Sequence, residues 1–299
     1  MAWRTVVISN PARLRIENDQ LTIIQDEAVC LPLEDVAVLV LESHEVLLSA
    51  ALLNRLAELD VMLLVCDARH LPSMAGVPFA GHSRLAGVQR LQLGMTEPFR
   101  KRCWQAVVQR KIANQAACLR ILDRPGHEAV AAMTDKVGSG DPTNVESSAA
   151  REHFRRAFGD GFARGGPDTV NSALNYGYAI MRAAVARALS FHGFLPAHGI
   201  HHRSELNPFN LADDFIEPLR PVVDLCVAGM TLDDEGLSKE NRQTLVGLLH
   251  AEVLVDGARQ QTLYAAELMA GSFLSACRAK RPGALKLPCL LPIKMHDYE

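Results

Sequence analysis

The chain has 299 residues, which is long enough for two domains with separate cores. Its composition, 48% hydrophobic and 22% charged, is typical of a folded globular protein and excludes a disordered chain. The net charge of -3 does not indicate a general polyanion-binding surface, so any contact with nucleic acid must depend on local clusters of basic residues.

The cysteines and the N-terminus indicate a cytoplasmic protein. The seven cysteines are scattered, odd in number and without a Cys-x-x-Cys pair, a pattern that favours reduced core thiols. Arg4, Arg13 and Arg15 interrupt the N-terminus and argue against a secretory leader, while the longest apolar runs are only as long as a strand.

The first eighty residues have the pattern of a β-rich domain. Short β-branched or leucine-rich runs predict strands at residues 5–9, 13–17, 21–25, 36–41 and 61–66. Turn signals such as Asn10-Pro11 separate them, so neighbouring strands are expected to pair antiparallel. Leucines at helical spacing predict one helix over residues 48–59. We expect residues 1–80 to form a β-sandwich-like domain that carries one helix and supports dimerisation.

Beyond Gly76, Pro78 and Gly81 the sequence becomes alanine-rich and helical. Asp168 or Thr169 is the expected N-cap of one helix. Helices are predicted at residues 93–122, from 141 or 143 onward, and at 169–193, 211–226, 239–255 and 260–279. The predicted class is therefore α+β: a small β-rich domain, a larger all-α catalytic domain over residues 81–281, and a proline-containing tail over residues 282–299.

The segment 198–221 is dense in potential metal ligands. It holds His198, His201 and His202, and Glu217 follows the last of these by fifteen residues. Asn207-Pro208 predicts a turn and Asn210 a helix N-cap, so a loop histidine can face a helical carboxylate. Three imidazoles suit zinc, but no cysteine lies nearby, and one histidine with two carboxylates suits a catalytic divalent site.

Glu146 has two interpretations from spacing alone. It shares a helical face with Ala149, Ala150 and His153, which lets its carboxylate point into the domain. Alternatively, Thr143-x-x-Glu146 matches a capping box, in which the glutamate only satisfies a backbone N–H.

The carboxylates that follow the histidines are also open to two interpretations. Asp213 and Asp214 lie four and three residues before Glu217, so one helical face can present a carboxylate pair to a hard cation. The two aspartates also suit the positive end of a helix dipole. Glu217 fits that second interpretation less well, because it precedes Pro218 at an expected kink.

Four motifs occur in an order that resembles the CRISPR-associated integrases that insert new spacers, in their type II branch. They are ExxAA from Glu146, LNYGYA at 174–179, GIHH at 199–202 and NLADDFIEP at 210–218. The likeness extends over nearly the whole chain. It implies that Glu146, His202 and Glu217 hold Mg²⁺ or Mn²⁺, with Asp214 in support. His201 is adjacent to His202 and remains the alternative ligand.

The resemblance also implies the reaction and the partners. The reaction is a metal-dependent attack of a DNA 3′-hydroxyl on a phosphodiester, which inserts short foreign fragments into a CRISPR array for antiviral defence; water as nucleophile gives endonuclease activity. Expected partners are double-stranded DNA, a second copy of the chain and a small ferredoxin-like Cas protein. The candidate DNA contacts are His82, Arg84, Arg90, Lys101, Arg102, Lys111 and Arg203. Core packing is expected for Tyr176, Tyr178 and Trp104.

Two other functions are compatible with a helical domain rich in histidine and acid. One is a metal-dependent nucleotide phosphohydrolase, although that class carries a His-Asp pair on a helix and none of the predicted helices contains one. The other is a non-catalytic helical interaction module whose acidic residues only cap helices.

Overall fold

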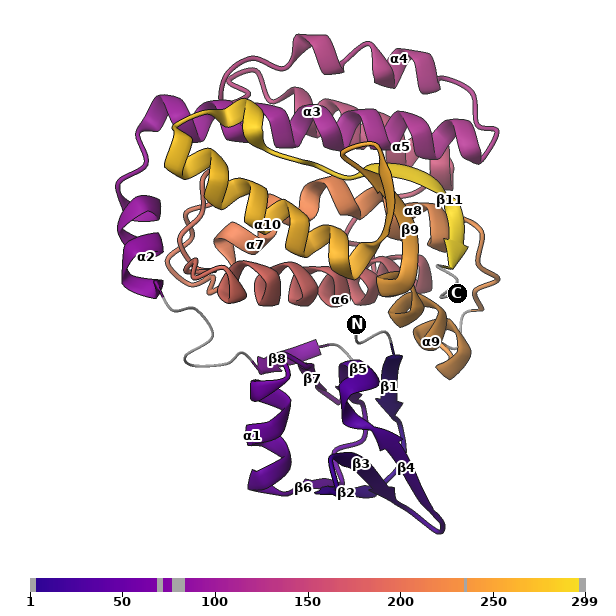
Figure 1. Ribbon diagram of the computed structural model, residues 1–299. Coiled ribbons are helices and arrows are strands. Elements are labelled where there is room, and N and C mark those ends of the chain that lie inside the picture. Colours follow the sequence, from indigo (N-terminus) through magenta and orange to yellow (C-terminus); the bar gives the residue numbers. More distant parts are fainter. Residues whose placement is uncertain (1–3, 69–71, 77–83, 234–235, 296–299) are drawn as a thin grey trace. The chain divides into compact units, whose positions relative to one another are not determined.

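The computed structural model describes residues 4–68, 72–76, 84–233 and 236–295. They divide into two compact units, Met1–Ser83 and Arg84–Glu299, close to the point where the sequence changes its pattern. The first unit is rich in strands and the second is mostly helical, as Figure 1 shows. The chain therefore has the mixed α+β class that the sequence predicts.

The described residues of the N-terminal unit form two four-stranded sheets and one α-helix. The order of the first sheet is β1 (Arg4–Ile8), β5 (Val36–Leu41), β7 (Met62–Cys66) and β8 (Pro72–Gly76). The order of the second is β4 (Ala28–Pro32), β3 (Gln20–Ile24), β2 (Ala12–Glu17) and β6 (Val46–Leu48). Helix α1 (Ala50–Glu58) begins at Ser49, whose side chain accepts a hydrogen bond from the Leu52 backbone.

The expected antiparallel pairing is correct for β2 with β3 but wrong for much of the unit. β1 and β7 both pair parallel to β5, and β2 pairs parallel to β6. β5 reads VAVLVL and is buried at every position, as befits a central strand covered on both faces. A parallel return needs a crossover, which α1 supplies between β5 and β7. The edge strands β4 and β8, one largely exposed and the other beginning with proline, were not predicted.

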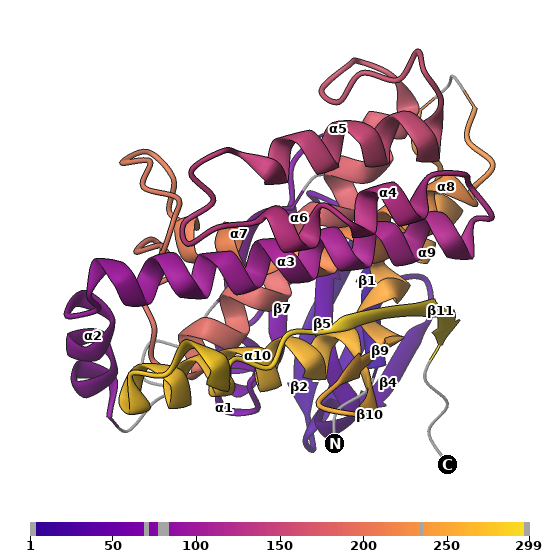
Figure 2. The same cartoon turned by 90° about the horizontal axis from the view of Figure 1, so that it is seen from above.

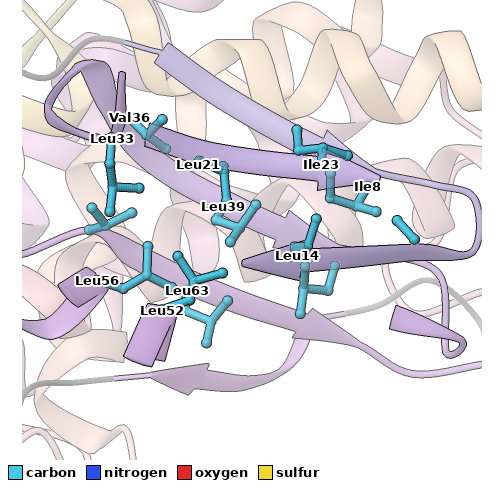
Figure 3. Close-up of a cluster of buried hydrophobic side chains, with 13 residues drawn as sticks. Ile8, Leu14, Leu21, Ile23, Leu33, Val36, Leu39, Leu52, Leu56 and Leu63 are labelled. Carbon is cyan, nitrogen blue, oxygen red and sulfur yellow. The ribbon is translucent and has the colours of Figure 1, made fainter. Parts of the chain in front are cut away.

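One apolar cluster forms the core of this unit and draws on both sheets and the helix (Figure 3). Leu14 and Leu21 come from the second sheet, Leu39 from the first, and Leu52 and Leu56 from α1. Each such side chain contributes about 1.5–3 kcal/mol when fully buried.

The C-terminal unit is built on two long helices, α3 (Glu97–Ile121) and α6 (Thr169–Phe191). Figure 2 shows α3 running across the width of this unit. The other helices are α2 (Leu85–Leu93), α4 (His127–Ala131), α5 (Val145–Phe158), α7 (Asn210–Ile216), α8 (Arg220–Ala228), α9 (Lys239–Gly247) and α10 (Thr262–Ala279). α3 contacts α4, α5 and α8, whereas α6 contacts α7, α8 and α10. Asp168 caps α6 through a hydrogen bond from Asn171, as predicted.

The long helix predicted over residues 93–122 is confirmed as α3, but it begins four residues later, because Leu93 ends α2, Gly94 caps that helix, and Pro98 lies in the first turn of α3. Prolines break a second predicted helix. Residues 211–226 divide into α7, a 3-10 turn η3 (Glu217–Leu219) and α8, since Pro218 and Pro221 cannot donate backbone hydrogen bonds.

The second unit is not all-α, contrary to the prediction. A three-stranded sheet has the order β10 (Ala258–Gln261), β9 (Ala251–Val255) and β11 (Cys289–Met295). Asp256 and Gly257 connect β9 to β10 with positive φ angles of 53° and 80°, the turn chemistry of a tight hairpin. The predicted helix 239–255 therefore ends at Gly247, and the predicted tail contains a paired strand. No helix of the described residues is long and apolar enough to span a membrane.

Candidate metal centre

Glu146 and Glu217 meet at one buried cation. Glu146 lies in the first turn of α5 and Glu217 begins η3, yet both carboxylates form ion pairs with the ammonium of Lys111 on α3. Lys111 is only 6% exposed. Two elements that are far apart in the sequence thus direct carboxylates at the same point.

The local structure of α5 frees the Glu146 side chain for this contact. The Asp141 carboxylate caps the helix instead, accepting hydrogen bonds from the backbone N–H groups of Val145 and Glu146, both at 2.9 Å. Asn144, just before the helix, has a positive φ of 52°. The capping-box alternative at Thr143 is therefore wrong, because a different acid satisfies these backbone groups.

Glu217 is a buried, ionised carboxylate, 5% exposed. Its Oε1 accepts a hydrogen bond from Arg220 Nε at 2.8 Å. Its Oε2 faces Lys111 as an ion pair and accepts no hydrogen bond of good geometry within the described part of the chain. Burial raises the pKa of Glu217, but the charges of Arg220 and Lys111 outweigh it and bring the pKa to about 2.

Lys111 itself stays charged despite its burial. Desolvation lowers the pKa of its ammonium, but Glu217 and Glu146 more than offset this and raise the pKa above the ordinary value. Two carboxylates and two cations, Lys111 and Arg220, therefore balance one another at the base of the site.

His202 lies in the loop between α6 and α7 and is held by Asp214. Its Nδ1 contacts Asp214 Oδ1 at 2.8 Å, which leaves Nε2 as the nitrogen that can take a metal ion. Asp214 is fully buried and also accepts hydrogen bonds from the backbone N–H groups of Ile200, His201 and His202, at 2.6, 3.1 and 3.1 Å. The hydrogen bond with Asp214 raises the pKa of His202, against the effect of burial. Asp214 is thus saturated as an acceptor and orients the loop.

Asn210 ties the same loop together instead of capping α7, contrary to the prediction. Its side-chain amide donates to the carbonyls of Ala197, Ser204 and Asn207, and its oxygen accepts from the Ser204 backbone. The N-cap position of α7 is Phe209. The loop that carries His202 is therefore fixed at both ends by buried polar side chains.

His201 is placed differently from His202. Its ring stacks on Trp104, with centroids 4.1 Å apart and an interplanar angle of 4°. His202 meets the same indole edge-on at 5.8 Å. Trp104 is 4% exposed, so it packs in the core as the sequence predicts. Burial lowers the pKa of His201. Of the two imidazoles, only His202 has the carboxylate partner on its second nitrogen that is usual for a metal ligand.

The donor set fits a hard divalent cation, and one cation already lies within it. As the side chains stand, the described residues contain no group of three or more His, Cys, Asp or Glu close enough to share an ion. Glu146 and Glu217 both pair with the Lys111 ammonium. The hydrogen bond with Asp214 is the main cause that raises the pKa of His202, and the charge of Glu217 adds to it. Two carboxylates and an oriented imidazole are nevertheless ligands that suit Mg²⁺ or Mn²⁺.

The remaining predicted residues lie away from this convergence. Asp213 accepts a hydrogen bond from Asn207 at 2.6 Å and pairs with Arg182 at 3.8 Å. Of the DNA-contact candidates, His82 lies outside the described residues, and Lys111 is buried and paired with Glu146 and Glu217. The exposed candidates are Arg84, Arg90, Lys101, Arg102 and Arg203. Lys101 also pairs with Glu97 at 2.8 Å.

Sequence reasoning missed an arginine cluster beside Glu217. Arg164 and Arg220 both lie over the Tyr178 ring, at 5.3 and 4.6 Å from its centroid. They border a polar pocket of about 180 Å³ lined by Arg164, Asn175, Tyr178, Ala179, Arg182, Asp213, Ile216 and Arg220. The Tyr178 hydroxyl donates to Asp224, which contacts the buried His153 at 2.9 Å. The position of Arg220, one turn after Glu217, was the available signal.

The family model described as CRISPR associated protein Cas1 matches residues 5–243 of the chain. The chain belongs to the Cas1 family. A Cas1 relative from Neisseria meningitidis serogroup C (strain 8013), named CRISPR-associated endonuclease Cas1, is 42% identical over 309 residues, covering 100% of each chain. A Cas1 from Hyperthermus butylicus (strain DSM 5456 / JCM 9403 / PLM1-5) is 28% identical and covers 63% of this chain and 64% of its own. These comparisons confirm the function predicted from the ordered motifs, which is endonuclease activity and spacer integration in CRISPR adaptation.

Solved structures of low sequence identity share the Cas1 fold. A casposase bound to integration product has a TM-score of 0.77 at 15% identity, covering 93% of this chain and 92% of its own. A Cas1 protein from Thermotoga maritima has a TM-score of 0.72 at 14% identity, covering 92% and 97%. A Cas6-RT-Cas1 chain in complex with Cas2 has a TM-score of 0.72 at 20% identity and covers 95% of this chain but 36% of its own.

Proposed function

We propose that Glu146, His202 and Glu217 together hold one or more Mg²⁺ or Mn²⁺ ions and that this centre joins DNA 3′ ends to a CRISPR array. The observation that carries the proposal is the convergence of two glutamates from separate elements on one buried cation, beside an imidazole oriented by a carboxylate. A bound ion supplies charge stabilisation for the phosphorus oxygens and the leaving oxygen of the attacked phosphodiester.

The surrounding residues prepare the three ligands. Arg220 keeps Glu217 ionised and fixes one of its oxygens, while Asp141 caps α5 so that Glu146 can reach across to α3. Asp214 sets the orientation of His202 and leaves Nε2 to face the ion. No protein nucleophile is needed, because a DNA 3′-hydroxyl attacks in integration and water attacks in hydrolysis.

DNA is the proposed substrate, and its phosphates are the proposed partners of the exposed basic residues. Arg203 follows His202 directly, while Arg90, Lys101 and Arg102 lie on α2 and α3. Arginine and lysine grip phosphates without reading bases, which suits donors of arbitrary sequence. The casposase bound to integration product, which has the same fold, supports this assignment by analogy.

The proposed assembly is a homodimer that joins a small ferredoxin-like Cas protein in the cytoplasm of a prokaryote. The solved Cas1 complexes that include Cas2 support a Cas partner. The two sheets of the N-terminal unit contribute to one apolar core, which supports the proposal that this unit is a sandwich-like dimerisation domain.

A matched pair of variants tests the metal role. With Mn²⁺ and a branched or free-ended DNA duplex, Glu146→Gln is expected to lower strand cleavage and joining by more than about a hundredfold, because it removes a ligand charge. Glu152→Gln, on the same helix but paired with Arg155 and Arg156, is expected to stay within about twofold of the parent. Full activity in Glu146→Gln would falsify the assignment.

A second pair of variants tests which of the two histidines binds the metal ion. His202→Ala is expected to abolish activity, whereas His201→Ala is expected to lower it less, because His201 stacks on Trp104 instead of contacting Asp214. Loss of activity in His201→Ala with activity retained in His202→Ala would move the ligand by one residue.

A further inference from the structure

The cation between the two glutamates is presented by a rigid part of α3. Three residues after Lys111, the Asn114 amide donates to the carbonyls of Pro218 and Pro288, at 2.7 and 2.9 Å. The Asn114 oxygen accepts from the Leu290 backbone at 3.0 Å. α3 is thereby fastened to η3, which carries Glu217, and to the chain entering β11. The placement of Lys111 against Glu217 is therefore part of the packed fold.

Burying an ammonium costs free energy unless anionic partners compensate. Lys111 has two such partners, and both are proposed metal ligands. Arg220, the other cation of the site, contacts Glu217 through the opposite oxygen and lies over the Tyr178 ring. Among the described residues, Lys111 is the cation that pairs with both carboxylates.

An ammonium and a divalent ion cannot share that position. Mg²⁺ and Mn²⁺ bind carboxylate oxygens at about 2.0–2.2 Å, so an ion held by both glutamates overlaps the volume of the Lys111 ammonium. Two cations so close together also repel strongly in a partly buried site. The lysine has a flexible four-carbon stem, so its head can move while α3 stays in place.

We propose that Lys111 is an internal competitor of the metal ion, a role that rests on the metal centre proposed above. Its ammonium holds Glu146 and Glu217 together in the metal-free protein and leaves them when the ion binds. The exchange gives both carboxylates a cationic partner when no metal is bound, and it weakens the affinity for the ion by the free energy of the lysine contacts that must break.

Metal affinity measured without DNA tests this exchange. By isothermal titration with Mn²⁺, Lys111→Met is expected to bind at least about tenfold more tightly than the parent, because the competing charge is gone while the chain length is kept. Lys111→Arg keeps the charge and is expected to bind no more tightly than the parent. Lys136→Met, an exposed lysine of the same unit, is the matched control and is expected to leave the affinity unchanged. Equal or weaker binding by Lys111→Met overturns the exchange.

Glu146→Gln separates failure of the exchange from failure of the metal centre. If Glu146→Gln weakens Mn²⁺ binding while Lys111→Met does not strengthen it, the centre stands and the exchange is wrong. If Glu146→Gln binds Mn²⁺ like the parent, the centre is wrong and the exchange falls with it.

If Lys111→Met does not fold, the release of Lys111 on metal binding can be measured in the parent protein instead. Acetylation of its lysines, followed by mass spectrometry, is expected to show Lys111 modified at least about threefold faster with Mn²⁺ than with EDTA, relative to Lys136. An unchanged rate for Lys111 under saturating Mn²⁺ contradicts the proposal.

Discussion

Different interactions hold the histidine side and the glutamate side of the candidate centre in place. On the histidine side, Asp214 accepts four hydrogen bonds and leaves His202 oriented, so this side is already arranged. On the glutamate side, Glu146 and Glu217 are held by a cation and one carboxylate oxygen accepts no hydrogen bond. For the proposed metal centre, the comparison implies that the histidine side is already arranged for an ion, whereas the glutamate side has to exchange one cation for another.

The largest expected effect is a loss of stability when the cation is removed from the glutamate side. Lys111→Met leaves the buried Glu217 and the partly buried Glu146 without the cation they share, so we expect it to lower the free energy of unfolding by about 3–5 kcal/mol in EDTA. Saturating Mn²⁺ should restore a large part of this loss. Urea unfolding of parent and variant, with and without Mn²⁺, measures both quantities, and a variant as stable as the parent in EDTA would show that the ion pairs are weak.

The second largest expected effect is a loss of stability in acid, caused by protonation of Glu217 on the glutamate side. The folded-state pKa of Glu217, about 2, lies below its ordinary value of 4.5, so its contribution is present above pH 4.5 and is lost as the pH falls toward 2. We expect about 3 kcal/mol to disappear over that window in EDTA. Glu217→Gln should flatten this part of the stability profile. An equally steep profile in Glu217→Gln would assign the acid sensitivity to other carboxylates.

On the histidine side, Asp214→Asn is expected to cost about 2 kcal/mol of stability, because an amide supplies one acceptor oxygen where the carboxylate supplied two. Activity should fall about 10–100-fold, since His202 loses its orienting partner. Asp213→Asn is the neighbouring control and should change stability by less than about 1 kcal/mol, because its ion pair with Arg182 is long. Equal effects at the two positions would show that Asp214 does not orient His202 specifically.

The smallest expected effect is the pH response of His202. Its pKa is raised, so the contribution of its charged form is present below pH 6.5 and is lost as the pH rises through the folded-state pKa. This sign is opposite to that of Glu217. Unfolding of the parent and of His202→Gln in EDTA, between pH 5 and 9, should differ by less than about 1 kcal/mol at the alkaline end, with the gap widening toward acid. A gap that widens toward alkali would reverse the assignment.

Local signals predicted the elements that carry the ligands. The Asp168 cap located α6, the Glu217-Pro218 pair located a kink, and the shared face of Glu146 and Ala149 located a carboxylate that can point inward. These features depend on residues within one or two turns of each other, which is the range over which a sequence pattern carries information.

The predictions that failed concern features that depend on residues far away in the sequence. Lys111 lies in the polar stretch 110–115, which has the composition of a solvated helix face, and it is buried only because α5 and η3 bring carboxylates to it. β11 contains Pro292 and follows Pro288, so it was not predicted, and it is a strand because β9 pairs with it. Parallel pairing in the first unit was missed for the same reason, since a crossover links strands that are not neighbours in sequence.

The most direct test of the central claim is a crystal structure of the protein soaked with Mn²⁺, with the ion located by anomalous scattering. The account predicts a peak bound by Glu146, Glu217 and Nε2 of His202, with the Lys111 ammonium moved away from both carboxylates. A peak elsewhere, with Glu146 and Glu217 still paired to Lys111 at saturating Mn²⁺, would contradict it.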